Sequence, residues 1–172
     1  MKKQLKDYSL QELVNTGREF EFFWKGNFSQ WAYSPFKEGN VSFKNMEQYM
    51  MYKKALLFKD EESAKLILAN SSPKVIKQLG RGVKGFKESV WNDHKYSIVK
   101  EGNILKYSQN KHLLDELLAT GNRILVEASP YDRIWGIGLS EENPDARNPF
   151  KWRGQNLLGF ALTEVKELLQ ES

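Results

Sequence analysis

The stretch Asn45–Asp60, NMEQYMMYKKALLFKD, decides the fold, because it opens the part of the chain in which helical signals dominate. Asn45 is a favoured N-cap residue, and Gln48 three positions later resembles the second half of a capping box. Apolar and long side chains then recur at helical spacing, at Met46, Tyr49, Met50, Lys53 and Leu57. The stretch therefore predicts a helix that begins after Asn45.

Further helices are predicted on the C-terminal side of this stretch. Asp60 caps EESAKLILAN, and Ser72-Pro73 begins a third helix that we expect to end at Gly80. Three patterns follow: an amphipathic segment over about 87–100, NKHLLDELLAT before Gly121, and a final helix over about 156–169. Toward the N-terminus, SLQELVNT at 9–16 predicts a short helix with a Ser cap.

Strand signals are few and short. They fall at Glu19–Trp24, at Val41–Phe43 after a Gly39-Asn40 turn, and at Ile124–Ala128. These strands do not alternate regularly with helices, so the pattern does not support a Rossmann-type array. The sequence predicts an α+β fold, a mostly helical single domain over 1–172 with a few short strands and a core at about 20–170.

Composition excludes several classes of protein. The chain has no cysteine and only two histidines, so disulfides, zinc-thiolate sites and thiol nucleophiles are excluded and no metal is expected. No signal-peptide core and no run of about 20 apolar residues is present, so we expect a cytoplasmic protein without a membrane segment, acting as a monomer. The net charge of +4 permits a phosphate-bearing ligand, although a mixed-charge surface explains it equally.

The first group of residues with chemical potential lies at the start of the predicted helix. Glu47 falls in its first turn, and Lys54 follows seven residues later on the same face. A carboxylate and an amine on one helix face can form an acid/base or nucleophilic pair. The structural alternative is a dipole-favoured glutamate next to ordinary surface lysines.

The second group follows the strand at 124–128. Glu127 ends the strand, and a loop containing Asp132, Arg133, Trp135 and Gly136 comes after Ser129-Pro130. An arginine can clamp phosphate, a tryptophan can stack on a base, and a glycine lets the backbone approach a ligand. The structural alternative is an Asp–Arg ion pair beside a core tryptophan.

Two further segments are weaker candidates. Asn156 caps the final helix or binds a ligand hydroxyl, and capping is the favoured interpretation. Leu79-Gly80-Arg81-Gly82 with Trp91 offers a basic and aromatic wall, although Gly80 is also a natural helix C-cap.

These segments together resemble the NADAR (YbiA-like) family of N-glycosidases over roughly Phe22 to Val165. The resemblance is carried by an ordered series of short pieces: Phe28-Ser29, Ser34-Pro35-Phe36, Glu47-Gln48-Tyr49 with Lys54-Ala55, Leu79-Gly80-Arg81 with Trp91, Lys106-Tyr107-Ser108-Gln109-Asn110, Leu125-Val126-Glu127-Ala128-Ser129-Pro130, Asp132-Arg133-Ile134-Trp135-Gly136-Ile137-Gly138 and Asn156-Leu157-Leu158-Gly159. The chain departs from the family pattern at Gln48, where a histidine is frequent, and at Ser29-Gln30-Trp31, where Ser-Asn-Phe is more usual.

The resemblance implies hydrolysis of a bond between a base and a ribose, without a metal or redox cofactor. The leading expectation is removal of ADP-ribose from guanine in nucleic acid. The alternatives are hydrolysis of phosphoribosylamino-pyrimidine intermediates of riboflavin synthesis and non-catalytic binding of ADP-ribose or NAD.

The resemblance also implies which residues act. Carried over by position, the expected catalytic residues are Glu47, Lys54 and Asp132, and the expected ligand-binding residues are Phe28, Ser29, Arg81, Trp91, Glu127, Arg133, Trp135, Gly136 and Asn156. Glu47 or Asp132 stabilises the positive charge that develops at C1′, by analogy with carboxylate glycosidases. Lys54 is a phosphate ligand or attacks C1′ of a ring-opened ribose to form an imine.

Overall fold

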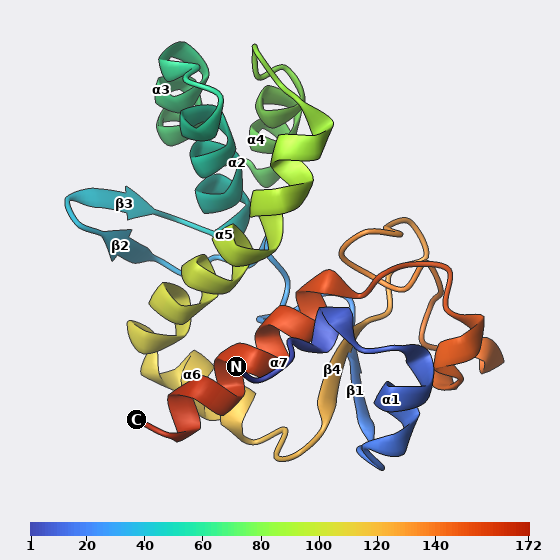
Figure 1. The fold of residues 1–172 in the computed structure, drawn as a ribbon. Helices are drawn as coiled ribbons and strands as arrows, with labels where there is room; N and C mark the ends of the chain where they lie inside the picture. Colours follow the sequence, from blue (N-terminus) through green and yellow to red (C-terminus); the bar gives the residue numbers. More distant parts are fainter. The chain divides into compact units, whose positions relative to one another are not determined.

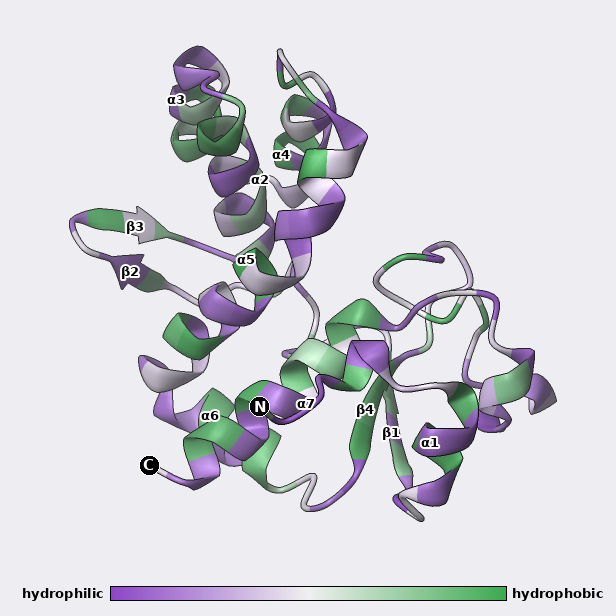
Figure 2. Ribbon diagram, in the orientation of Figure 1, coloured by the Kyte–Doolittle hydropathy of each residue, from purple (hydrophilic) through white to green (hydrophobic).

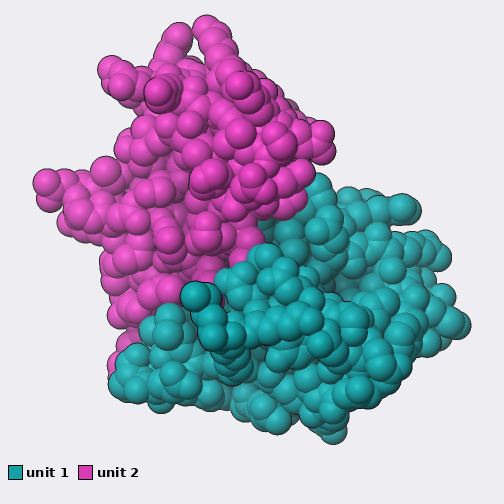
Figure 3. Space-filling view, in the orientation of Figure 1, with its two compact units in different colours: residues 1–29, 114–172 teal, residues 30–113 magenta.

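The computed structural model describes residues 1–172, which form seven α-helices, three 3₁₀-helices and four short strands (Figure 1). The predicted mostly helical α+β class is confirmed. The chain divides into two compact units, coloured separately in Figure 3. Unit 1 comprises residues 1–29 and 114–172, and unit 2 comprises residues 30–113.

Unit 2 is built around α2. Its two strands are β2 (Phe36–Glu38) and β3 (Val41–Phe43). Its helices are α2 (Met46–Leu57), α3 (Glu61–Ala69), α4 (Pro73–Arg81) and α5 (Glu88–Ser108). The strands β2 and β3 pair as an antiparallel hairpin across the predicted Gly39-Asn40 turn, and β2 itself was not predicted. Helix α2 packs against α3, α4 and α5. Glycines permit two of these contacts, because a Cβ at Gly80 would overlap Met51 and a Cβ at Gly102 would overlap Tyr49.

Two helix ends differ from the prediction. Gly80 lies inside α4, which continues to Arg81 and has Gly82 as its C-cap. Gly80 serves close packing against α2, because a Cβ at this position would overlap Met51. Helix α5 runs on to Ser108, well past the predicted end near residue 100, since buried residues continue along it. Helix α4 packs against α2 and α3, and α5 packs against α2 and β2, contacts between segments distant in the sequence.

The cap of α2 is confirmed, but the capping box is not. The Asn45 side chain accepts a hydrogen bond of 2.8 Å from the Gln48 backbone N–H. The Gln48 side-chain oxygen accepts a hydrogen bond of 2.7 Å from the Lys44 N–H, and not from the Asn45 N–H that a capping box requires. Its amide also donates to the carbonyls of Ile67 and Asn70, which ties the start of α2 to the end of α3.

Unit 1 contains the only parallel strand pair. Its strands are β1 (Phe20–Phe23) and β4 (Ile124–Glu127), and its α-helices are α1 (Leu10–Asn15) and α7 (Leu157–Gln170). Its 3₁₀-helices are η1 (Leu5–Asp7), η2 (Pro144–Arg147) and η3 (Pro149–Lys151). Helix α6 (Lys111–Leu118) leads the chain from unit 2 into unit 1. Strands β1 and β4 pair in register from Phe20 with Ile124 to Phe23 with Glu127.

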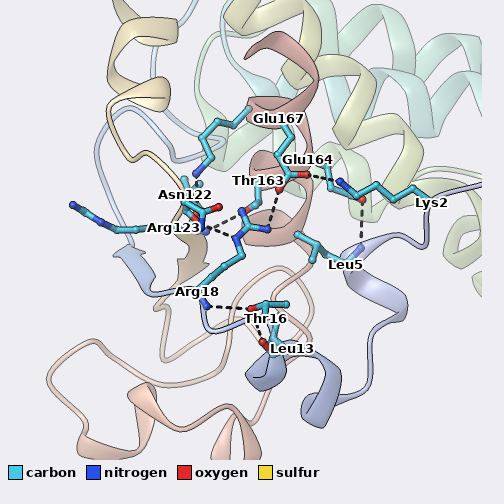
Figure 4. A network of polar contacts seen from close by, with 12 residues as sticks. Lys2, Leu5, Leu13, Thr16, Arg18, Asn122, Arg123, Thr163, Glu164 and Glu167 are labelled. Carbon is cyan, nitrogen blue, oxygen red and sulfur yellow. Dashed lines mark hydrogen bonds and ion pairs between the residues drawn. The ribbon is translucent and has the colours of Figure 1, made fainter. Parts of the chain in front are cut away.

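Helix α7 packs on β4, and both are largely hydrophobic where they meet (Figure 2). A second cluster of buried side chains contains Val126, Ala128, Ile137, Leu139 and Ala146. Polar contacts fasten the N-terminal segment to α7 (Figure 4). Arg18 donates to the Asn122 carbonyl at 2.8 Å and pairs with Glu167 at 2.9 Å. None of the helices has the length and apolarity needed to cross a membrane.

Candidate functional site

Lys54 lies on α2 among aromatic rings. Its Nζ is 4.7 Å from the ring centroid of Phe86 and 5.5 Å from that of Trp91. The side chain is partly buried and donates no hydrogen bond within the chain. An ammonium over two aromatic faces is held by cation–π attraction, which fixes its position without occupying its protons.

Burial and the charged groups around Lys54 together set the pKa of its amine. Burial lowers the pKa of Lys54 most, the nearby Arg81 guanidinium lowers it further, and the Glu47 carboxylate opposes both. The net shift is downward, so a larger fraction of the amine is neutral at a given pH than in a solvated lysine. Glu47 is only 4% exposed in the first turn of α2, and its influence on Lys54 agrees with the predicted shared helix face.

Four segments supply this cluster in unit 2. Glu47 and Lys54 come from α2, Arg81 ends α4, and Trp91 lies in the first turn of α5. Phe86 precedes α5, and sequence reasoning missed it. The available sequence signal was an aromatic residue directly after a glycine, Gly85. In the structure Gly85 has a φ of 76°, a turn conformation that glycine favours.

The neighbouring Lys53 serves a different purpose. Its Nζ pairs with Glu38 at 2.8 Å, and the Tyr49 hydroxyl donates to the same carboxylate at 2.9 Å. Burial raises the pKa of Glu38, but these hydrogen bonds outweigh burial and hold the pKa below its usual range. Lys53 therefore links α2 to the β2–β3 hairpin, whereas Lys54 has no such partner.

In unit 1, Asp132 organises the loop that follows β4. Its carboxylate accepts hydrogen bonds from the backbone N–H groups of Ile134 at 2.9 Å and Trp135 at 2.8 Å. Its carbonyl accepts from Gly138 N at 3.1 Å. Arg133 is exposed and forms no ion pair with Asp132, so the structural alternative of an Asp–Arg pair is wrong. The Asp132 carboxylate holds the shape of this loop.

Asn156 occupies the predicted N-cap position of α7, but its side chain makes no cap bond. Its backbone is left-handed (φ 54°). Its side chain instead accepts from Glu127 N at 2.9 Å and donates to the Leu125 carbonyl at 3.1 Å, which extends the hydrogen bonding of β4. The carbonyls of Ile134 and Trp135 accept from the first two amides of α7.

The remaining expected ligand-binding residues of unit 1 pack in different ways. Gly136 permits a close approach, but to the chain itself, because a Cβ there would lie 2.9 Å from the Glu127 carbonyl oxygen. Phe28 is buried and packs edge-on against Phe23, with the two ring centroids 5.6 Å apart. The Ser29 N–H donates a hydrogen bond of 3.1 Å to the Gly26 carbonyl, which closes a turn.

The expected ligands of unit 1 differ in exposure. Arg133 is exposed, whereas Ser29, Glu127 and Trp135 are partly exposed. No three His, Asp or Glu side chains gather anywhere in the molecule where they could hold a metal ion. The candidate groups of unit 1 therefore comprise a cation and an indole on a loop that backbone hydrogen bonds hold in place.

The NADAR domain model matches residues 22–170, nearly the whole chain. The chain belongs to the NADAR family. A relative in Acanthamoeba polyphaga mimivirus named N-glycosidase R617 is 47% identical, over 84% of this chain and 88% of its own. The NMR structure of the E. coli protein YbiA covers 89% of this NADAR chain and 86% of its own, with a TM-score of 0.73 and 28% identity.

A plant protein represents another branch of similarity. The maize Riboflavin biosynthesis protein PYRR, chloroplastic, is 34% identical over 55% of this chain. The match spans only 14% of the maize protein. A NADAR-like segment thus occurs within a much longer protein of a different name.

Proposed function

We propose that this NADAR protein is an N-glycosidase that hydrolyses the bond between a base and a ribose, and that its substrate is guanine carrying ADP-ribose in a nucleic acid. The observation that carries the proposal is the Lys54 cluster: an amine with a lowered pKa, fixed between two rings beside a buried carboxylate. The family membership and the N-glycosidase name of the mimivirus relative support the reaction type.

The chemistry follows from the charges that develop as the bond breaks. Positive charge forms at C1′ and negative charge on the departing base, so an anion near the sugar and a proton donor to the base both favour cleavage. In the proposed reaction, the Glu47 carboxylate stabilises the charge at C1′ and orients the groups around it. The base leaves with the bonding electron pair and takes up a proton.

Lys54 is the proposed nucleophile. The ribose ring opens when the C1′–O4′ bond breaks and O4′ takes up a proton, which leaves C1′ doubly bonded to the base nitrogen. The neutral Lys54 amine adds to C1′; the bond from C1′ to the base nitrogen then breaks, the base takes up the proton that the amine gives up, and an imine on Lys54 remains. Water then adds to the imine carbon, the carbon–nitrogen bond of Lys54 breaks with return of a proton to the amine, and ADP-ribose leaves with its ribose as the open-chain aldehyde. The lowered pKa of Lys54 favours the neutral amine that this attack requires.

The other expected residues take supporting roles in the proposal. Arg81 is the proposed phosphate ligand beside Lys54, and Trp91 shapes the space around the sugar. In unit 1, Arg133 and Trp135 remain the proposed phosphate and base ligands. We favour Glu47 over Asp132 as the acting carboxylate, because Asp132 already accepts two backbone hydrogen bonds within its loop.

The test compares two glutamates that both lie in the first turn of a helix. Glu47→Gln should lower turnover of a guanine-ADP-ribosylated oligonucleotide about 10²- to 10³-fold, because a neutral amide cannot stabilise the positive charge that develops at C1′. Glu61→Gln, at an exposed first-turn position of α3, should leave turnover within about twofold. Chromatographic release of ADP-ribose is the measurement, and unchanged turnover by Glu47→Gln would contradict the assignment.

A second substrate in the same assay separates the alternatives. The phosphoribosylamino-pyrimidine intermediate is offered in parallel, since the maize relative is named for riboflavin biosynthesis. Cleavage of the pyrimidine alone would replace the proposal with a riboflavin-type N-glycosidase. Cleavage of neither substrate, with retained ADP-ribose binding, would make the protein a binding module.

A further inference from the structure

A line of positive charge runs along the exposed side of α4 and continues beyond it. Lys74, Lys77 and Arg81 are spaced three and four residues apart, so they share one helix face, and all three are exposed. The opposite face carries the buried Ile76 and Gly80, which anchor α4 in unit 2. We name Lys74, Lys77, Arg81, Lys84 and Lys87 the basic stripe.

No acidic residue interrupts this region of the sequence. Between Glu62 and Glu88 the chain contains six lysines and arginines and no aspartate or glutamate. Unit 2 as a whole has 15 basic and 8 acidic residues, a net charge of +7, whereas unit 1 has 11 and 14, a net charge of −3; together they give the +4 of the chain. The positive charge is therefore concentrated in unit 2, a distribution that the overall net charge conceals.

The chain itself hardly neutralises the basic stripe. Only Lys84 approaches a carboxylate, that of Glu62 at 4.0 Å, and both side chains are about 80% exposed. An exposed pair at this distance contributes little. Like charges along one face repel one another, and a polyanion that binds there removes this repulsion.

The basic stripe passes the proposed catalytic lysine. Arg81 is close enough to Lys54 to lower its pKa, and the ring centroid of Phe86, between the last two lysines of the stripe, lies 4.7 Å from Lys54 Nζ. Phe86 is also 44% exposed, so part of its side chain is accessible at the surface beside Lys54. A chain of phosphates along the stripe would thus carry an attached base toward Lys54.

We infer that the basic stripe binds the phosphate backbone of a single-stranded nucleic acid and delivers a modified base to Lys54. The inference rests on the proposed function, since the strand bears the bond to be cleaved. From Lys74 to Arg81 the helix rises about 10 Å, or about three nucleotide steps of 3.4 Å. A substrate with one or two phosphates does not need five cations. A base within a duplex reaches an enzyme pocket only after it is unpaired and flipped out, a cost that a single strand does not carry.

The test measures binding of a fluorescein-labelled, unmodified 15-nucleotide single strand by anisotropy at several salt concentrations. The variant Lys74→Gln with Lys77→Gln removes two exposed charges and should weaken binding about tenfold at low salt. It should also reduce the slope of log K against log salt by about 1.4, at about 0.7 for each phosphate that the variant no longer neutralises. The matched control, Lys37→Gln with Lys44→Gln, removes two exposed lysines near the β2–β3 hairpin and should bind as the parent does.

Turnover separates failure of the inference from failure of the proposed function. The stripe variant should lower kcat/KM about tenfold on an ADP-ribosylated oligonucleotide and leave kcat/KM on the ADP-ribosylated mononucleoside unchanged. If neither substrate is cleaved but the stripe variant still loses strand binding, the stripe is a strand-binding surface, and both the proposed function and delivery of a base to Lys54 fail. If the control variant loses as much binding as the stripe variant, net charge alone explains it and the inference is overturned.

An anionic membrane is the competing partner. Vesicles of phosphatidylcholine with about 30% phosphatidylserine, an anionic surface that attracts lysines and arginines, are tested with the same pair of variants by co-sedimentation. Vesicle binding that depends on the stripe, combined with strand binding that does not, would overturn the inference in favour of a lipid surface.

Discussion

Lys166 and Lys54 both lie away from bulk water, and their surroundings are opposite in kind. Lys166 on α7 in unit 1 is fully buried and donates hydrogen bonds to the Thr120 hydroxyl at 3.0 Å and to the Arg123 carbonyl. Lys54 on α2 in unit 2 is partly buried between two rings and donates none. Burial is the largest cause of a lowered pKa in both, to about 8 for Lys166.

The difference shows what makes a buried lysine structural or chemical. The protons of Lys166 are held by acceptors that fasten the α6–β4 connection to α7, so moving the amine would leave those acceptors unpaired. Aromatic faces position the Lys54 ammonium without holding its protons, so that the neutral amine left by loss of a proton has a lone pair free to form a new bond. Desolvation favours the neutral amine in both, and only the absence of acceptors makes that amine available for reaction.

The largest expected effect is on catalysis at Lys54. Lys54→Arg keeps the positive charge but removes the primary amine that forms the imine, so turnover should fall at least about 10³-fold while the free energy of unfolding changes by less than about 1 kcal/mol. Turnover of the ADP-ribosylated oligonucleotide and urea unfolding are the two measurements.

Borohydride trapping sharpens this prediction. Parent protein with substrate should gain a reduced adduct on Lys54, identified by mass spectrometry after proteolysis, and Lys54→Arg should gain none. Active parent protein that forms no adduct would show that Lys54 is a phosphate ligand and not the nucleophile.

An intermediate effect, on stability, is expected at Lys166. Lys166→Ala leaves a cavity around the lost stem and an unpaired carbonyl at Arg123, so the free energy of unfolding should fall by about 2–4 kcal/mol. Turnover per folded molecule should not change. Urea unfolding is the measurement, and Lys151→Ala, at a solvent-exposed ion pair of the same unit, should shift stability by less than about 0.5 kcal/mol.

The pH dependence of stability distinguishes the charge of Lys166 from its packing. The folded-state pKa of about 8 lies below the unfolded value of 10.5, so between these pH values the unfolded chain holds a proton that the folded chain has released. The free energy of unfolding contributed by Lys166 should therefore rise as pH increases from about 8 to 10.5. Lys166→Ala should lack this rise, and an equal rise in the variant would assign it to other groups.

The smallest expected effect is at Lys53, next to Lys54 in the sequence. Lys53→Gln removes a partly exposed ion pair with Glu38, so the free energy of unfolding should change by about 0.5 kcal/mol and turnover should stay within about twofold. A large loss of turnover would show that the contrast between the two adjacent lysines is misassigned.

Local patterns predicted most of the helices correctly, because caps and spacing are short-range signals. Asn45, Asp60 and Ser72 cap helices as expected, and Gly39-Asn40 forms the hairpin turn. Predictions failed where a side chain has partners distant in the sequence. Asn156 resembles a cap residue, but its side chain bonds to β4 about thirty residues earlier, and Gly80 resembles a helix end but meets Met51.

The sequence alone determined the helical α+β class, the start of α2, and the placement of Glu47 and Lys54 on one face, since each depends on contacts within two helical turns. Only the tertiary structure brought Phe86 and Trp91 to Lys54, and only the tertiary structure gave Lys166 its acceptors. The reason is physical: spacing fixes which side of a helix a lysine occupies, but its desolvation and hydrogen bonding depend on elements that fold against that side.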